Sequence, residues 1–294
     1  KLTNSGDTMS KILITGTSKG IGYDAALCLA RNGHEVVATM RNPNNSDLSE
    51  VASKESLNID IQALDVDDID SVKEVFDKVG AIDVLINNAG ILSYNILEDE
   101  SIERFMEVVN TNLFGVVRCC KAVIPRMRAA KSGCIINIGS VAGKVTIPCS
   151  SAYSSSKHAI EAFSEVLAQE MLPFGVRVHL VQPGIIDTPM ATTEFPAPKK
   201  DSLYPQGKRV SALFAAASQV DAPASLVSDK LKYLIEVGDE RLRHPVGPDS
   251  LVFLGYRASV DDERLISTWG AASDEEFLRK SGQDMMMDLT PFME

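Results

Sequence analysis

The sequence predicts an α/β protein with a doubly wound parallel sheet of about seven strands and helices on both faces. Short, continuously apolar runs alternate with longer amphipathic stretches from residue 11 to residue 181. Strands of this kind, each separated from the next by a helix, are typical of a sheet buried on both faces. Because no repeat or linker interrupts the alternation, we expect residues 9–294 to form a single domain. The polar residues 1–8 precede Met9, and we expect them to be a tag or a disordered tail.

The predicted strands are the apolar runs at residues 11–15, 34–40, 58–64, 82–87, 134–139, 176–181 and 242–246. Between them, apolar residues recur at helical spacing, as at Val72, Phe76 and Val79. The clearest predicted helices span about residues 21–32, 67–80, 101–130, 151–172 and 223–237.

A long excursion follows the sixth strand, because residues 183–209 hold five prolines and few periodic positions. Long loops in compact domains often cover functional sites. We predict a substrate loop at about residues 190–215, with apolar side chains that could lie over a ligand. They are Phe195, Leu203, Tyr204, Leu213 and Phe214. The acidic C-terminal segment after it receives no role from the sequence.

Charge and cysteine usage exclude several classes of protein. A net charge of −11 argues against a general nucleic-acid or anionic-membrane surface. No apolar stretch approaches the roughly 18 residues of a membrane span, and we expect a cytoplasmic protein. The cysteines lack metal-ligand spacing, so we expect no metal site and mostly buried free thiols. Cys149, close to Tyr153, is interpreted as a wall residue rather than a nucleophile, since no histidine pairs with it in sequence. The others are Cys28, Cys119, Cys120 and Cys134.

A glycine-rich turn, TGTSKGIG at residues 15–22, joins the first strand to the first helix. Gly16 allows a tight turn, and Gly20 and Gly22 allow close backbone approach and close helix packing. Amides at the helix start can then receive a pyrophosphate. Glycines also occur in turns for steric reasons alone, but the position between first strand and first helix favours nucleotide binding.

A second group of chemically capable residues follows the fifth predicted strand. Ser140 comes directly after the apolar run, and Tyr153 and Lys157 stand four residues apart on one face of a predicted helix. A phenol, an ammonium and a hydroxyl brought together can move a proton at an alcohol or carbonyl oxygen. A Tyr and a Lys at this spacing are more often surface residues, so this interpretation depends on the other motifs.

Those motifs occur in the order typical of one family. They are TGTSKGIG, Asp65 with Val66, NNAG at residues 87–90, Asn112, Ser140, YSSSK at residues 153–157 and PGIIDT at residues 183–188. With its G-x3-G-x-G turn, the sequence resembles the short-chain dehydrogenase/reductase family, which has a Rossmann-type fold, over about residues 11–190. Within the family it is most similar to hydroxysteroid and retinol dehydrogenases, on ATMRNP at residues 38–43 and RHPVGPD at residues 243–249.

The resemblance implies a nicotinamide dinucleotide as cofactor. Asp65 would accept a hydrogen bond from the adenine amino group and Val66 would pack beside the ring, while Asn87 would steady the sheet. As alternatives, Asp65 and Asn87 cap turns. The other implied contacts are Gly16, Ser18, Lys19, Gly20, Ile21 and Gly22 in the turn, Asn88, Ala89 and Gly90 near the ribose, Pro183, Gly184, Ile186 and Thr188 along the nicotinamide, and Tyr153 and Lys157.

The end of the second strand bears on the choice of cofactor. Enzymes that prefer NAD usually place a carboxylate there to bind the ribose 2′-OH, whereas residues 38–41 read ATMR. Lys19 and Arg41 are placed to meet a 2′-phosphate; alternatively, they solvate a turn and a strand end. We predict NADP(H) rather than NAD(H).

The resemblance also implies catalytic roles. A free phenol has a pKa of about 10, and the Lys157 ammonium would lower that of Tyr153, as would the first turn of a helix. Tyr153 would give its proton to a carbonyl oxygen in reduction and take it back in oxidation, while Ser140 hydrogen-bonds that oxygen. Asn112 would bind a water that links Lys157 to solvent, and Gly115 would ease a local helix distortion.

The predicted function is NADP(H)-dependent interconversion of a carbonyl and an alcohol by hydride transfer, on an apolar substrate. One alternative is a non-catalytic NADP(H)-sensing regulator, but such relatives typically lose the Tyr or the Lys. Another is epimerisation or dehydration of a nucleotide sugar, but those relatives favour a G-x2-G-x2-G turn. The family often pairs through the helices predicted at residues 101–130 and 151–172, which implies a homodimer or homotetramer. Cys119, Val123 and Met127 could belong either to that interface or to the core.

Overall fold

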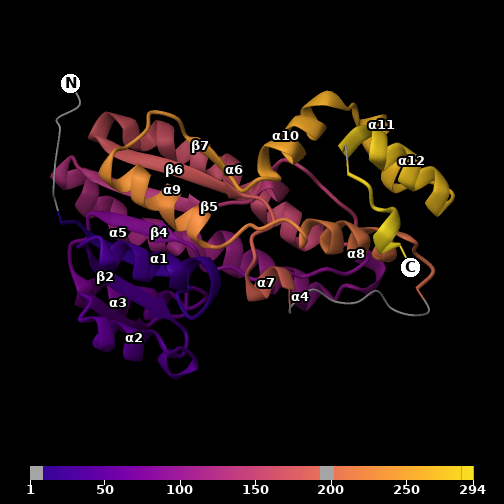
Figure 1. The fold of residues 1–294 in the computed structure, drawn as a ribbon. Coiled ribbons are helices and arrows are strands. Elements are labelled where there is room, and N and C mark those ends of the chain that lie inside the picture. The colour runs from indigo at the N-terminus through magenta and orange to yellow at the C-terminus, as the bar shows by residue number, and fades with distance from the viewer. Residues whose placement is uncertain (1–8, 193–201, 286, 294) are drawn as a thin grey trace.

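The computed structural model describes residues 9–192, 202–285 and 287–293 and contains a seven-stranded sheet in the order β3-β2-β1-β4-β5-β6-β7 (Figure 1). All neighbouring strands are parallel. The strands are β1 Lys11–Thr15, β2 Glu35–Met40, β3 Ile59–Ala63, β4 Val84–Asn87, β5 Gly133–Ile138, β6 Val176–Pro183 and β7 Arg243–Val246. The predicted fold class is confirmed. The expectation for residues 1–8 lies outside the described residues.

Helices cover both faces of the sheet. One buried apolar cluster joins the sheet to α1, α2 and α9, and a second joins it to α3, α5 and α6. The helices are α1 Gly20–Arg31, α2 Leu48–Glu55, α3 Ile69–Val79, α4 Ile102–Val109, α5 Val116–Ala130, α6 Ser151–Met171, α7 Pro189–Thr192, α8 Gln206–Ala217, α9 Ser225–Glu236, α10 Ser250–Ser259, α11 Asp262–Trp269 and α12 Asp274–Met285. Cys119, Val123 and Met127 are buried in the second cluster, so they belong to the core. Within the described ranges, no helix has the length and apolar character needed to cross a membrane.

The single helix predicted over residues 101–130 is interrupted in the structure. A π-helical turn, Asn110–Gly115, separates α4 from α5. Close packing accompanies it, because a Cβ on Gly115 would lie 2.8 Å from Cγ2 of Val66. Isolated π turns within α-helices occur frequently at functional sites.

The last part of the predicted substrate loop, about residues 190–215, is not irregular, because residues 206–217 form helix α8. Its buried face packs on α10, α11 and α12 in a third apolar cluster, and these helices lie together at one end of the molecule (Figure 1). Arg209 of α8 is buried and fastens them. Its Nη1 donates to the carbonyl oxygens of Trp269 and Ala271, at 3.0 and 2.9 Å, and its Nε donates to Asp274 Oδ1 at 3.1 Å.

Two histidines are buried side by side on β6 and β7. Nδ1 of His179 lies 3.2 Å from Nε2 of His244, and the rings meet edge to face. Burial lowers the pKa of His179 from 6.5 to about 4, against a smaller raising effect of its hydrogen bond to the carbonyl oxygen of Arg241. Burial also lowers the pKa of His244, and the nearby Asp239 carboxylate works against this.

We expect the protein to lose stability in mild acid because of this pair. A histidine whose folded pKa is lowered binds its proton more readily when unfolded, so its contribution is present above pH 6.5 and declines as the pH falls towards 4. For His179 the loss by pH 5 is about 2 kcal/mol. Urea unfolding at pH 7.5 and pH 5.0 measures it. His179→Asn, which keeps a donor near Nδ1 but does not titrate, should lose less; equal losses in both proteins would contradict the assignment.

Candidate active site

A cavity of about 360 Å³ lies at the carboxyl ends of the strands. Strands β1 and β4 are neighbours there, and the helices that follow them cover opposite faces of the sheet. Ligands of doubly wound sheets bind at such a point. All of the predicted site residues line the cavity except Gly22 and Asn112. Those that line it are Gly16, Ser18, Lys19, Gly20, Ile21, Arg41, Asp65, Val66, Asn88, Ala89, Gly90, Ser140, Tyr153, Lys157, Pro183, Gly184, Ile186 and Thr188.

The glycine turn forms a cradle that side chains would fill. Gly16 has φ +73°, and a Cβ there would lie 2.8 Å from Cα of Ala89. A Cβ on Gly22 would lie 2.4 Å from both Gly16 O and Asn88 Nδ2, so Gly22 serves the packing of the turn rather than the cavity surface. Helix α1 begins at Gly20, and its first residues, Gly20 and Ile21, line the cavity, so that a pyrophosphate there would meet the N-terminal end of the helix. The residues present therefore fit a dinucleotide.

Acidic and polar side chains lie at the end of the cavity formed by the residues that follow β3. Asp65 Oδ1 accepts from the Asp67 amide at 3.0 Å, so Asp65 caps a turn and lines the cavity at once. Asp67, which the sequence did not single out, also lines the cavity and accepts from Thr111 Oγ1 at 2.7 Å. Burial raises the pKa of Asp67. Asn87 instead donates to Asn137 Oδ1 at 2.9 Å, between β4 and β5, and steadies the sheet.

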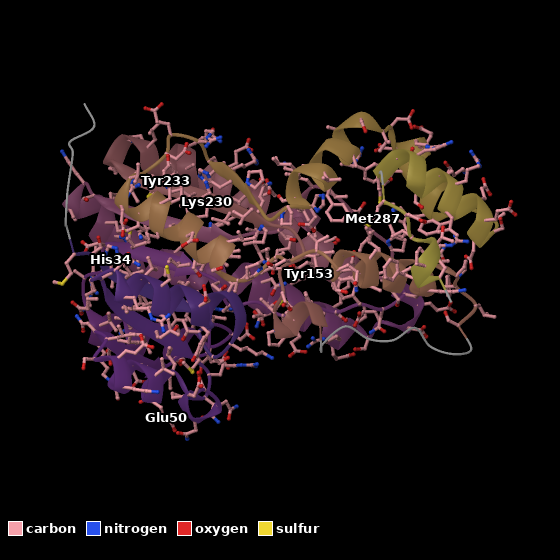
Figure 2. All side chains as sticks on the ribbon, in the orientation of Figure 1. His34, Glu50, Tyr153, Lys230, Tyr233 and Met287 are labelled. Carbon is pink, nitrogen blue, oxygen red and sulfur yellow. The ribbon has the colours of Figure 1, made fainter. Side chains whose placement is uncertain are left out.

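The predicted catalytic side chains meet between β5 and α6. Tyr153 lies in the first turn of α6 with Lys157 one turn later, and Ser140 follows the end of β5. The Ser140 hydroxyl lies beside the Tyr153 phenol and acts on its pKa as a hydrogen-bond donor. Lys157 Nζ donates to the carbonyl oxygen of Ile138 at 2.9 Å and lies 5.6 Å from the centre of the Tyr153 ring. Figure 2 shows Tyr153 near the middle of the molecule, between the sheet and the C-terminal helices.

The predicted lowering of the Tyr153 pKa is wrong in direction. Burial raises the pKa of the phenol, and the hydrogen bond from Ser140 opposes this only in part. Burial also lowers the pKa of Lys157 to about 8, because an ammonium loses its hydration there. The sequence shows that the two groups are neighbours but not how deeply both are buried. The phenol therefore holds its proton at neutral pH.

Asn112 connects segments instead of lining the cavity. Its Oδ1 accepts from the Ile91 amide at 2.8 Å, and its Nδ2 donates to Ile91 O at 2.9 Å and to Ser156 Oγ at 3.0 Å. Ser156 in turn donates to the carbonyl oxygen of Tyr153. Asn112 thus holds the segment after NNAG to the first turns of α6. A water relay through Asn112 stays a prediction.

The opposite end of the cavity has apolar and aromatic walls. Tyr94 stacks edge to face on Phe214, with ring centres 5.3 Å apart, and lies 6.4 Å from the Tyr153 ring. Of the predicted loop residues, Leu213 and Phe214 line the cavity, whereas Leu203 and Tyr204 are exposed and Phe195 lies outside the described residues. Sequence reasoning missed the remaining wall residues. Examples are Tyr94, Val145, Ile147 and Phe253.

Asp249 holds the segment that forms the floor of the cavity between β6 and α7. Its Oδ2 accepts from the Ile185 amide at 2.8 Å, and a Cβ on Gly184 would lie only 2.0 Å from its Oδ1. Only glycine fits between this carboxylate and the cavity. Asp249 ends the RHPVGPD segment, so the sequence carried a signal but gave no role for it.

These features define a doubly wound α/β fold with a cavity that fits a dinucleotide, and comparison with known proteins agrees. The family described as short chain dehydrogenase matches residues 10–199. Oxidoreductase BOA17 of Botryotinia fuckeliana is 38% identical over 261 residues, which are 86% of this chain and 94% of that protein. Retinol dehydrogenase 8 of Bos taurus is 36% identical over 212 residues, which are 67% and 68% of the two chains.

Solved structures give the same result. A short-chain dehydrogenase from Streptomyces avermitilis superposes with a TM-score of 0.77 at 27% identity, covering 90% of this chain and 98% of that one. A single-residue variant of actinorhodin polyketide ketoreductase with NADPH gives 0.72 at 26% identity, covering 81% and 95%. The chain belongs to the short-chain dehydrogenase family, a family of oxidoreductases that bind a nicotinamide cofactor.

Cys149 lies beside the site but not in it. Its neighbours Ile147 and Ser150 line the cavity, whereas Cys149 packs against the third apolar cluster. It adopts φ +63°, a left-handed conformation that a non-glycine residue seldom takes. Burial raises the pKa of its thiol to about 11. The expectation of a wall residue is thus corrected to a supporting one.

We therefore expect Cys149 to be a poor nucleophile. With this pKa, on the order of one thiol in 10,000 is ionised at pH 7. Cys149→Ala should retain turnover within about twofold of the unaltered protein, since the thiol does not face the cavity. Labelling of the Cys149 peptide by iodoacetamide, followed by mass spectrometry, should accelerate about tenfold per pH unit up to pH 10. Rapid labelling at pH 7 with loss of turnover would contradict this.

Proposed function

We propose that this protein is an NADP(H)-dependent oxidoreductase that interconverts a ketone or aldehyde and an alcohol, with Tyr153 as general acid and base. One observation carries the proposal. The phenol of Tyr153 and the hydroxyl of Ser140 line the same cavity as the glycine turn and the segment from Pro183 to Thr188. A proton donor and a dinucleotide cradle therefore share one enclosed space.

The residues that would hold the cofactor line the cavity from one end to the other. The turn from Gly16 to Ile21 would receive the pyrophosphate, with Asp65 and Val66 at the adenine and the segment from Pro183 to Thr188 at the nicotinamide. When bound, the nicotinamide supplies a hydride in reduction or accepts one in oxidation. Lys19 and Arg41 line the cavity where a ribose 2′-phosphate would lie, and residues 38–41 at the end of β2 include no carboxylate. This charge pattern supports NADP(H).

The proton is handled by the chain's own residues. In reduction, Tyr153 gives its proton to the carbonyl oxygen, while Ser140 donates a hydrogen bond as negative charge develops there. A phenol kept protonated by burial suits this direction. Lys157, with a pKa of about 8, is still mostly protonated at pH 7 and stabilises the phenolate left behind. In oxidation the same groups act in reverse.

The walls beside Tyr153 support an apolar substrate. Among the described residues, the ionisable carboxyl, ammonium and guanidinium groups that line the cavity are Lys19, Arg41, Asp65, Asp67 and Lys157. Four of these five groups follow β1, β2 and β3 and so lie at the other end of the cavity, and Lys157 is beside Tyr153. Among the described residues, the walls formed by Tyr94, Phe214 and Phe253 therefore offer no further cation to pair with a carboxylate or phosphate. A neutral carbonyl compound with an apolar body matches that surface. Burying such a body against aromatic rings would stabilise the complex by about 25 cal/mol per Å².

Two observations support the proposed location and assembly. All five cysteines are free, which is typical of a reducing compartment and supports a cytoplasmic protein. Exposed apolar side chains on α4, on the π turn and on α6 support a homodimer or homotetramer through these helices. They are Ile102, Met106, Phe114 and Val166. Charge and fold give no support for nucleic-acid binding.

Replacing Tyr153 by Phe tests the proposed chemistry. Loss of the proton donor should lower kcat for NADPH-dependent ketone reduction at least about 100-fold, because burial leaves few other donors near the oxygen. The dissociation constant for NADPH, measured by fluorescence, should stay within about threefold. Tyr233→Phe, an exposed phenol on α9 far from the cavity (Figure 2), is the matched control.

The unaltered protein is assayed with a panel of apolar ketones and with charged keto acids. Turnover of the apolar members that disappears in Tyr153→Phe supports the proposal. Tight NADPH binding without turnover of any carbonyl compound would favour the non-catalytic sensor instead.

Replacing Arg41 by Ala tests cofactor choice. A lost guanidinium–phosphate hydrogen bond costs roughly 1.5–3 kcal/mol, so kcat/KM with NADPH should fall about 10- to 100-fold. The value with NADH should change little, because NADH lacks the 2′-phosphate. Arg31→Ala, which removes an exposed arginine at the end of α1 paired with Glu55, controls for net charge. Equal losses with both cofactors would count against NADP(H) preference.

A further inference from the structure

A buried carboxylate lies one turn beyond the proposed catalytic side chains, on the same side of α6. Glu161 is one turn beyond Lys157 and is 3% exposed. It does not line the cavity, and the proposed chemistry does not use it. Burying a carboxylate is costly unless it is paired and hydrogen-bonded. The partners of Glu161 therefore show which segments the buried carboxylate connects.

Each partner of Glu161 comes from a different segment. Oε1 accepts from Gln182 Nε2 at 2.6 Å. Oε2 accepts from Arg243 Nε at 2.7 Å and lies 3.4 Å from Lys144 Nζ. Gln182 is buried on β6, Arg243 begins β7, and Lys144 follows the short turn after Ser140. One carboxylate thus joins four parts of the chain.

Two of these segments lead directly into the cavity. Gln182 immediately precedes Pro183 and Gly184, which form the cavity floor, and Lys144 lies between Gly143 and the cavity residue Val145. Contact between the second segment and α6 is close, because a Cβ on Gly143 would lie 2.9 Å from both Glu161 Cγ and Lys157 O. Glu161 therefore connects the segment that follows Ser140, the helix that carries Tyr153 and Lys157, and the strand that leads into the cavity floor.

The RHPVGPD segment supplies the outer fastening. Arg243 at its start reaches Glu161, and Asp249 at its end accepts from the Ile185 amide. Ser250, the next residue, donates to the carbonyl oxygen of Gln182 at 3.2 Å. The segment therefore braces the floor of the cavity against the catalytic helix from both ends.

We propose that Glu161 is a positioning residue, which through Gln182 and Lys144 sets the spacing between the 183–186 floor and the Tyr153–Ser140 pair. This inference rests on the proposed function, because that floor is where the nicotinamide would lie. A displacement of about 1 Å between reacting groups can cost about 100-fold in rate. Loss of the carboxylate should therefore slow the reaction more than it weakens cofactor binding.

Glu161→Gln removes the charge and keeps the side-chain length, and Glu165→Gln is its matched control. Glu165 is one turn further along α6 and accepts from the same Arg243, at Nη2, but it is exposed and belongs to the outer side of the network. Both variants lose one carboxylate partner of Arg243. Only Glu161→Gln disturbs the hydrogen bond from Gln182 and the 3.4 Å contact with Lys144 Nζ.

The first measurement is the single-turnover rate of NADPH oxidation with saturating apolar ketone. It should fall about 10- to 100-fold in Glu161→Gln, while the NADPH dissociation constant stays within about threefold and Glu165→Gln stays within about twofold in both. A Glu161→Gln rate within twofold of the unaltered protein would overturn the proposal. So would an equal loss in Glu165→Gln, since the effect would then belong to Arg243 alone.

The second measurement needs no turnover. Hydrogen–deuterium exchange of the ligand-free protein should accelerate in peptides covering residues 141–145 and 182–188 in Glu161→Gln, and not in Glu165→Gln. Unchanged exchange would overturn the inference even if the rate fell. If the unaltered protein binds NADPH but reduces no ketone, the proposed function fails, while the exchange result still decides whether Glu161 holds these segments.

Gln182→Met covers the case in which Glu161→Gln does not fold. It cuts the link between Glu161 and the cavity floor with an apolar side chain of similar length, and leaves the Glu161–Arg243 pair in place. We expect the same pattern, a slower single turnover at nearly unchanged NADPH affinity, with faster exchange confined to residues 182–188. A folded Gln182→Met protein with unchanged rate and exchange would contradict the proposal.

Discussion

Hydrogen bonds between Thr15 and Asn88 join the carboxyl ends of the neighbouring strands β1 and β4. Thr15 Oγ1 accepts from the amides of Asn88 and Ala89, each at 3.0 Å, and Asn88 Nδ2 donates to the carbonyl oxygens of Thr15 and Gly16, each at 2.9 Å. The connections after β1 and β4 go to opposite sides of the sheet, so a crevice opens between them. These hydrogen bonds fix its width. Every other group of the site is placed relative to that crevice.

Burial, rather than charge pairing, sets the state of the groups around the crevice. The surroundings of Tyr153 and Lys157 favour the uncharged form of each, which raises one pKa and lowers the other. At neutral pH the phenol of Tyr153 is therefore uncharged, and Lys157 gives up its proton more readily than an exposed lysine does. Charge is instead concentrated behind the site, where Glu161 meets its donors, and at the far end, where Lys19 and Arg41 lie.

The sequence predicted the parts of the structure that depend on local pattern. All seven strands, the glycine turn and the approach of Ser140, Tyr153 and Lys157 follow from apolar runs and from spacing. Contacts between distant segments were not predictable in this way. The engagement of Asn112 with Ile91, the π turn against Val66 and the wall formed by Phe253 each join residues far apart in sequence. The sign of the Tyr153 pKa shift was wrong for the same reason, because burial depth is a property of the whole fold.

The third apolar cluster packs one wall of the cavity separately from the sheet. The two clusters that flank the sheet carry the strands and their helices, whereas the third joins α8 and the C-terminal helices to Val141 and Val145. Of its members and neighbours, Leu213 and Phe214 on α8 and Phe253 on α10 line the cavity, whereas Val141 and Val145 flank the turn after Ser140. Replacing side chains on α8 and α10 would therefore reshape the aromatic end of the cavity without altering the residues that surround Ser140, which makes these two helices the natural place to change the shape of the site.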